Sequence, residues 1–150
     1  MKPDWILIAN ASQARLLKKE RGEPMVVIKS YSHSPSRSKA SDLGDSRAGG
    51  ERADRGFGAP AYQPRMDAQR KEHERFAHEL GDDLERHALQ GDFRSLRVFS
   101  CSPFLGELKA ALGTATGSLI AGTHDLDLTH VGLAELEGRV REEVEEPHQA

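Results

Sequence analysis

Residues 4–10, DWILIAN, form a short apolar run that ends in a polar turn, and this run decides the fold. A run without polar alternation is typical of a strand covered on both faces, because each face must then be apolar. Residues 13–20 (QARLLKKE) and 24–31 (PMVVIKSY) also suit strands, and short turns separate the three segments. Connections this short join neighbouring antiparallel strands, since a parallel pair needs a longer crossover. The sequence therefore predicts a three-stranded antiparallel meander.

The clearest helical pattern in the chain spans residues 66–91, MDAQRKEHERFAHELGDDLERHALQG. Its apolar residues recur at the spacing of one helix face, which predicts a helix packed on the sheet through Phe76, Leu80 and Leu84. Asp67 suits the N-terminal cap of this helix, and Gly91 suits its end. Gly81 lies inside the pattern at a cost of about 1 kcal/mol relative to alanine, so it marks either close packing or a weak point.

The last third of the chain alternates strands and helices, at residues 95–101 (strand), 102–113 (helix), 117–126 (strand) and 132–146 (helix). Two right-handed β-α-β crossovers added to an antiparallel meander make a mixed five-stranded sheet with helices packed on it. The predicted fold is therefore an α/β domain with the strand order of a ribonuclease-H-like domain. We expect a single domain over residues 1–146, followed by a short tail at 147–150.

Between the meander and the long helix lies a long polar segment, residues 32–65. Its middle, LGDSRAGGERADRG at residues 43–56, has one leucine and no other large apolar side chain. Such a segment cannot offset its ordering entropy by burial, and loops longer than about 12–15 residues are usually functional or disordered. We therefore expect a flexible loop that becomes ordered on a partner.

The composition limits the functions that the chain can have. The 150 residues carry 21 Lys and Arg against 24 Asp and Glu, so any contact with nucleic acid must use a local basic patch. The single cysteine, Cys101, excludes an internal disulfide framework and suits a reducing compartment. The first apolar run is shorter than the ~7–15 residues of a signal peptide, and no run approaches the ~20 residues of a membrane span. We expect a cytoplasmic protein with no membrane contact.

Five blocks of the sequence, taken in order, resemble a bacterial family described as "protein required for attachment to host cells". The blocks are DWILIANASQARLL, DLGDSRAG, KEHERFAHELGDDLERH, SPFLGELKAAL and DLDLTHVGLAELE. The resemblance covers nearly the whole chain, and its specificity comes from the number and order of the blocks. That family is similar to the middle domain of eukaryotic and archaeal class-one peptide-chain release factors. The resemblance implies the same sheet and a role in translation or in the stress response.

In the release factors, the loop between the third strand and the first long helix carries a Gly-Gly-Gln tripeptide. That tripeptide positions water for hydrolysis of peptidyl-tRNA. The resemblance places the polar loop of this chain at the same position, where Gly49 and Gly50 are followed by Glu51. Glutamine is a neutral donor and acceptor, whereas glutamate is a charged acceptor that would face the phosphates of RNA. The resemblance therefore implies a non-catalytic relative that contacts the ribosome or tRNA.

Arginines of the loop adjoin a basic start of the long helix, a pattern that favours a local RNA contact ordered on binding. The candidate RNA-binding residues are Arg37, Arg47, Gly49, Gly50, Glu51, Arg52, Arg55, Arg65, Arg70, Lys71 and Arg75. A solvated face of mixed charge is the alternative, because these cations are diluted by Asp54, Asp67, Glu72 and Glu74. We assign no catalytic residue, no metal ligand and no cofactor.

Two other functions stay open, an RNA hydrolase and a protein-interaction module in host attachment. A two-metal nuclease needs several carboxylates that converge from the ends of neighbouring strands. Asp4 and Asn10 flank the first strand, and Asp125 and Asp127 follow the fifth, but the fourth strand ends without an acid. The carboxylate constellation is therefore incomplete.

Other polar clusters have simpler interpretations. Residues 123–130, THDLDLTH, gather possible metal ligands (His124, Asp125, Asp127 and His130), but they suit a strand end in which Asp127 or Thr129 caps the next helix. His73 and His78 lie about 140° apart around a helix and cannot easily share one ion. Cys101 comes just before Ser102, the expected cap of a helix, and suits a small buried thiol.

Overall fold

A computed structural model describes residues 2–33 and 58–145, with side chains described from residue 67 onward in the second range. One sheet contains β1 (Asp4–Ala9), β2 (Gln13–Lys19), β3 (Val26–Ser32), β4 (Ser95–Ser100) and β5 (Ile120–Asp125). The strand order is β3-β2-β1-β4-β5. β1, β2 and β3 pair antiparallel, while β4 runs parallel to β1 and to β5. The predicted mixed five-stranded α/β sheet, with its meander and two crossovers, is confirmed.

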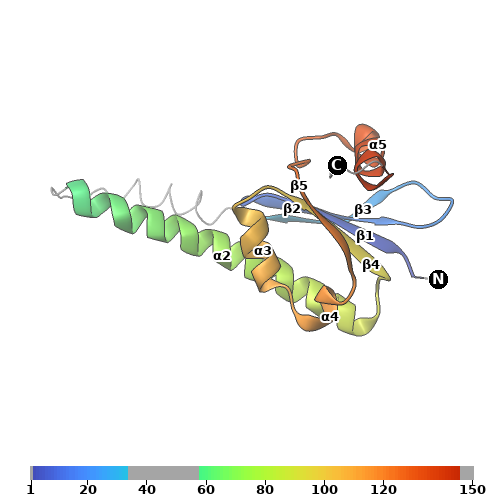
Figure 1. The fold of residues 1–150 in the computed structure, drawn as a ribbon, viewed down its shortest axis with the longest axis horizontal. Coiled ribbons are helices and arrows are strands. Elements are labelled where there is room, and N and C mark those ends of the chain that lie inside the picture. Colours follow the sequence, from blue (N-terminus) through green and yellow to red (C-terminus); the bar gives the residue numbers. More distant parts are fainter. Residues whose placement is uncertain (1, 34–57, 146–150) are drawn as a thin grey trace.

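Helices cover both faces of the sheet (Figure 1). One face carries α2 (Gly58–Gln90), α3 (Phe104–Ala111) and the short α4 (Thr114–Gly117), and the other carries α5 (Leu133–Glu145). Alternation along β1 divides the core between the two faces. On the α2 side, Trp5, Leu7 and Ala9 of β1 pack with apolar side chains that include Phe76, Leu80, Leu84 and Leu108. On the α5 side, Ile6 and Ile8 pack with a second group that includes Leu17, Phe99, Leu136 and Val140.

The central run predicted to be covered on both faces behaves as expected. Side chains from Trp5 to Ala9 are all buried, and none is more than 5% exposed. The prediction that Phe76, Leu80 and Leu84 hold the long helix on the sheet is also confirmed, because none of the three is more than 1% exposed. Burial of these large side chains, at roughly 1.5–3 kcal/mol each, stabilises the α2 layer.

Gly81 marks close packing of two helices and not a weak point of α2. A Cβ added to Gly81 would lie 2.4 Å from the backbone oxygen of Ala111 in α3. The glycine therefore allows α2 and α3 to approach more closely than any larger residue would permit, which explains a residue that weakens a helix interior.

Several predicted boundaries differ from the structure. α2 begins at Gly58, so its first eight residues occupy the end of the segment expected to be a loop, and Asp67 lies inside the helix instead of capping it. Pro60 falls in the first turn of α2, where a missing N–H group removes no hydrogen bond, so this proline does not exclude a helix. The segment from residue 34 to 57, which contains most of the predicted loop, lies outside the described residues.

Besides Asp67, two more of the expected helix caps were wrong. Pro103 is the N-cap of α3 and forms no side-chain cap bond. The Ser102 hydroxyl instead donates to Asp125 Oδ2 at 3.0 Å. Asp127 accepts hydrogen bonds from the backbone N–H and the hydroxyl of Thr129, whereas α5 begins only at Leu133. These polar side chains close local turns at strand ends, a use that competes with helix capping.

Candidate nucleic-acid interface

The N-terminal half of α2 extends away from the sheet (Figure 1). Every side chain from Asp67 to Lys71 is exposed, and Phe76 is the first fully buried side chain in the part of α2 whose side chains are described. A helix stretch that is polar on all sides cannot be stabilised by burial against its own domain. The projecting part of α2 is therefore a surface available to a partner.

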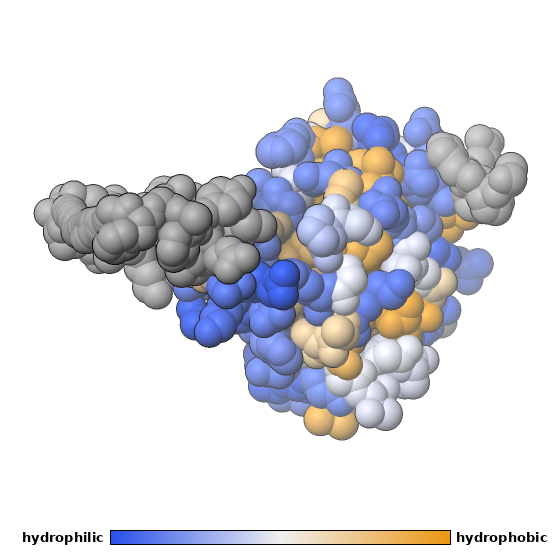
Figure 2. Space-filling view, turned by 60° about the vertical axis from the view of Figure 1, so that its left-hand side comes forward, coloured by the Kyte–Doolittle hydropathy of each residue, from blue (hydrophilic) through white to orange (hydrophobic). Residues whose placement is uncertain are grey.

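Three of the predicted RNA-binding cations belong to this part of α2. Arg70, Lys71 and Arg75 are all exposed. Figure 2 shows hydrophilic side chains gathered on the face of the molecule next to the grey atoms. Arg75 is partly neutralised, because its Nη1 lies 2.7 Å from Oε2 of Glu72 and both groups sit one turn apart on the helix. Arg70 and Lys71 are the more available pair for phosphate.

A buried histidine fixes the place where the chain leaves β3 for the polar segment. The His33 side chain is 7% exposed, and its Nε2 lies 2.9 Å from Glu72 Oε1. Its ring also stacks on Phe76, with 5.0 Å between the ring centroids and 21° between the planes. These contacts hold the end of β3 against α2. His33, the last described residue before the polar segment, therefore lies against Glu72 and Phe76 of α2.

Sequence reasoning missed His33 and Glu72 as a pair. Thirty-nine positions separate them, and no periodicity links a strand end to a helix across a long insertion. In the sequence, His33 stands at the boundary between a strand pattern and a polar segment, and that position does not indicate its partner.

Most of the other predicted RNA-binding residues lie outside the described part of the chain: Arg37, Arg47, Gly49, Gly50, Glu51, Arg52 and Arg55. Arg65 lies in α2, within the stretch for which only the backbone is described. The structure therefore places Arg70, Lys71 and Arg75 on the exposed part of α2, and RNA binding by the whole set stays a prediction.

A two-metal nuclease site, the alternative left open by the sequence, would need carboxylates at the carboxyl ends of the parallel strands. Asn10 lies there, but its side-chain amide already forms hydrogen bonds within the protein. Its Oδ1 accepts hydrogen bonds from the backbone N–H groups of Ser12 and Gln13 at 2.8 and 2.9 Å, and its Nδ2 donates to Thr129 at 3.0 Å. Arg15 anchors the same region by donating to the backbone oxygens of Leu128, Thr129 and Val131.

The acids at this edge also have structural partners. Asp125 accepts from the backbone and hydroxyl of Ser102, and Asp127 accepts from Thr129. Burial, followed by the charges of Asp127 and Asp125, raises the pKa of the nearby Cys101 thiol, which therefore stays protonated at neutral pH. Among residues 2–33 and 67–145, no group of three or more His, Cys, Asp or Glu side chains could hold a metal ion.

His124 points away from the acids beside it in the sequence. Its ring stacks on Phe99, with 4.4 Å between centroids and an interplanar angle of 9°, and its Nε2 lies 3.3 Å from Arg97 Nη1. Burial and the Arg97 charge lower the pKa of His124, so the imidazole is neutral at physiological pH. The cluster THDLDLTH is thus a strand end with diverging side chains, as the simpler interpretation predicted, but neither Asp127 nor Thr129 caps the next helix.

β1 begins at Asp4 and ends at Ala9, so Asp4 lies at the opposite end of the strand from Asn10. Arg94 donates to both carboxylate oxygens of Asp4 at 3.0 and 2.8 Å, and Ser95 donates at 2.7 Å. Burial alone would raise the pKa of Asp4, but these hydrogen bonds outweigh it and hold the pKa below its usual value. Asp4 and Asn10 cannot share one metal site.

None of the helices in the described part of the chain combines the length and the apolarity that a membrane span requires.

Comparisons with known proteins agree with this architecture. A solved structure titled "Archaeal protein" is similar over 97% of this chain, with a TM-score of 0.54 and 15% sequence identity. This chain spans 34% of that structure, and the likeness concerns the fold. No curated protein matches the sequence. A family model described as "Protein required for attachment to host cells" matches residues 5–140, and the chain therefore belongs to that family.

Proposed function

We propose that this protein is a cytoplasmic, non-catalytic domain that binds RNA on the ribosome or on tRNA and acts in translation or in the stress response. The proposal follows the resemblance of the sequence blocks to a family that is similar to the middle domain of release factors, and the strand order expected of a ribonuclease-H-like domain. That resemblance implies that the polar segment after β3 corresponds to the loop that faces RNA.

The observation that carries the proposal is the projecting half of α2. It presents Arg70 and Lys71 with no buried contacts, and His33 starts the polar segment on the same side of the domain. Phosphate contacts by arginine and lysine supply most of the affinity of non-specific nucleic-acid binding. A projecting basic helix that directly follows an arginine-bearing segment in the sequence is suited to such contacts.

An RNA hydrolase is the less favoured candidate. Asn10, Asp125 and Asp127 hold turns at the edge where hydrolytic metals would bind, so a metal ion would have to displace existing hydrogen bonds. Nucleophilic attack by Cys101 is also disfavoured by the raised pKa of its thiol.

The test is binding to purified ribosomes and to tRNA, measured as a function of salt concentration. We expect affinity to fall with salt at a log–log slope of about −0.7 for each phosphate contacted on single strands. The triple variants R70A/K71A/R75A and R47A/R52A/R55A should each weaken binding and flatten the slope by up to about 2, since three contacts of about 0.7 are removed.

A matched control removes the same charge elsewhere. The variant R21A/K109A/R139A takes three cations from the β2–β3 turn, α3 and α5, and it should bind like the wild type. Equal binding by the wild type and both interface variants would refute the RNA interface and favour a protein-interaction module in host attachment.

A further inference from the structure

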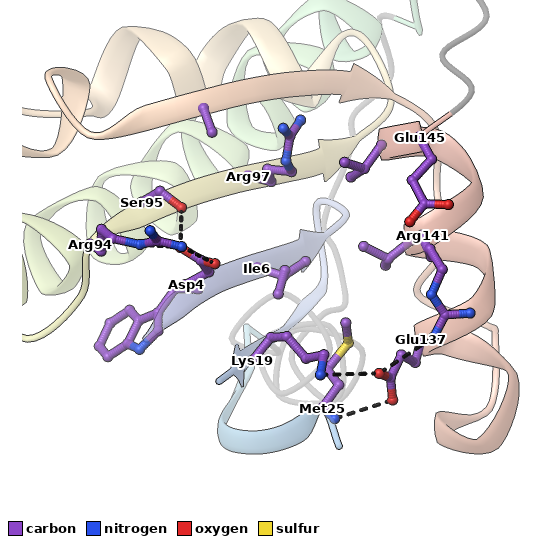
Figure 3. A pocket seen from close by; sticks show the side chains of 14 residues that line it. Asp4, Ile6, Lys19, Met25, Arg94, Ser95, Arg97, Glu137, Arg141 and Glu145 are labelled. Atoms are coloured by element: carbon purple, nitrogen blue, oxygen red, sulfur yellow. Dashed lines mark hydrogen bonds and ion pairs between the residues drawn. The ribbon is translucent and has the colours of Figure 1, made fainter. Parts of the chain in front are cut away.

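A pocket of about 540 Å³ lies between the sheet and α5, near the N-terminal ends of β1 and β4 (Figure 3). It is remote in the fold from the projecting half of α2, because α2 covers the opposite face of the sheet. Pockets of roughly 300–1,000 Å³ are the size that small-molecule ligands occupy. The volume therefore suits a small molecule better than a segment of RNA.

The floor of this pocket is apolar. Ile6, Met25 and Val140 are each 7% exposed or less, and Val144 is partly buried against them. Contact with such a surface stabilises a bound hydrocarbon by roughly 25 cal/mol for each Å² removed from water. The floor alone would accept any small apolar body.

The walls of the pocket add charge. Lys19, Arg94, Arg97 and Arg141 stand against Asp4, Glu137 and Glu145, which leaves one more cation than anions. Two of the acids already have close partners. Asp4 is held by Arg94 in a two-pronged hydrogen bond, while Glu137 accepts from the Met25 N–H and lies 3.6 Å from Lys19 Nζ.

The neighbouring strand β5 leaves room for the Arg97 guanidinium. A Cβ added to Gly122 would lie 2.7 Å from Arg97 Nη1, so the glycine in β5 leaves the space that the guanidinium occupies. The 3.3 Å contact of Arg97 with His124 is made to a neutral ring, and this contact does not cancel the charge of the guanidinium. Arg141 reaches the pocket from α5. Its Nη2 lies 3.6 Å from Glu137 Oε2, and its side chain is 56% exposed. Figure 3 shows Arg97 on the sheet wall and Arg141 on the helix wall.

We propose that this pocket binds a small amphipathic anion, with the apolar body on the Ile6–Met25–Val140 floor and a carboxylate or phosphate between Arg97 and Arg141. Carboxylates and phosphates share the geometry that a guanidinium recognises through paired N–H donors. The two headgroups are therefore separated by experiment.

The test is isothermal titration of the full chain with four probes: octanoate, octyl phosphate, octanol and inorganic phosphate. We expect saturable 1:1 binding of octanoate, octyl phosphate or both. Each bound anion should bind at least about tenfold more tightly than octanol or inorganic phosphate, because only the amphipathic anions use both the floor and the arginines. Tighter binding of octanoate would assign a carboxylate ligand, and tighter binding of octyl phosphate would assign a phosphate monoester.

Variants decide whether the arginines recognise the headgroup. R97Q and R141Q should each weaken binding of the anion by about tenfold and leave octanol unchanged, since a hydrogen bond to a charged group is worth about that factor or more. R139Q, on the same helix as Arg141 but outside the pocket, should bind like the wild type. Thermal unfolding of each variant identifies any loss of folding.

Two results would overturn the proposal. One is the absence of saturable binding by both amphipathic anions. The other is binding of octanol as tight as that of the anions, with R141Q and R139Q indistinguishable.

Discussion

Replacing Gly81 by alanine sets helix propensity against packing, and the two effects change the free energy of unfolding in opposite directions. Alanine in a helix interior is favoured over glycine by about 1 kcal/mol, so helix propensity alone predicts that G81A is stabilising. In the structure, the new Cβ would lie 2.4 Å from the backbone oxygen of Ala111 and 3.0 Å from its carbonyl carbon. The obstacle is backbone in α3, which cannot rotate away like the end of a side chain.

The magnitude follows from that distance. Ordinary contact at such a Cβ begins at 3.4 Å, so α2 and α3 must separate by about 1.0 Å, the difference between 3.4 and 2.4 Å. Overpacking of a core costs about 1–3 kcal/mol, and an immovable backbone atom places this site at the upper end. Subtracting the propensity gain leaves a net loss of about 2 kcal/mol. For a domain of this size, that loss lowers Tm by about 4–8 °C.

The assay is thermal and urea unfolding followed by circular dichroism at 222 nm. G138A is the matched control, because Gly138 lies in the interior of α5 and an added Cβ would have nothing within 4 Å. It should raise stability by about 0.5–1 kcal/mol. If G81A is as stable as the wild type, the close approach of α2 and α3 is refuted.

Three further predictions concern the core, a charged network and the chemistry of the polar segment. F76A should lower the free energy of unfolding in urea by about 3–5 kcal/mol, because Phe76 is fully buried, and a loss below 1 kcal/mol would contradict its place in the core. Burial would raise the pKa of Asp83, but hydrogen bonds from Lys29, Tyr31 and Arg86 lower it to about 2. The stability that Asp83 contributes is therefore complete above pH ~4 and is lost as pH falls through about 2. The stability advantage of the wild type over D83N, about 1 kcal/mol after solvent screening, should therefore be constant from pH 5 to 7 and shrink between pH 4 and 2, and a pH-independent difference would count against the network. The protein should release no labelled peptide from peptidyl-tRNA on ribosomes, since Glu51 cannot replace a neutral amide, and release that disappears in E51A would show this reasoning to be wrong.

Local pattern determined much of this protein. The unbroken apolar run from Trp5 to Ala9 requires cover on both faces, and the short turns after it allow only an antiparallel meander. The stripe of Phe76, Leu80 and Leu84 likewise specifies which face of α2 is buried, because helical spacing maps directly onto one side of the helix. The sheet order follows from these elements and from the right-handedness of crossovers.

Tertiary structure alone decided the roles of polar side chains and the limits of α2. Ser102 and Asp127 satisfy cap preferences in the sequence, but strand ends brought together by folding offered them other partners. Three features join residues that are far apart in the chain: the contact between His33 and Glu72, the packing of Arg97 against Gly122, and the pocket beneath α5. Hydrogen bonds and close approaches of this kind depend on differences of a few tenths of an ångström in the separation of two elements. Sequence periodicity carries no information at that scale.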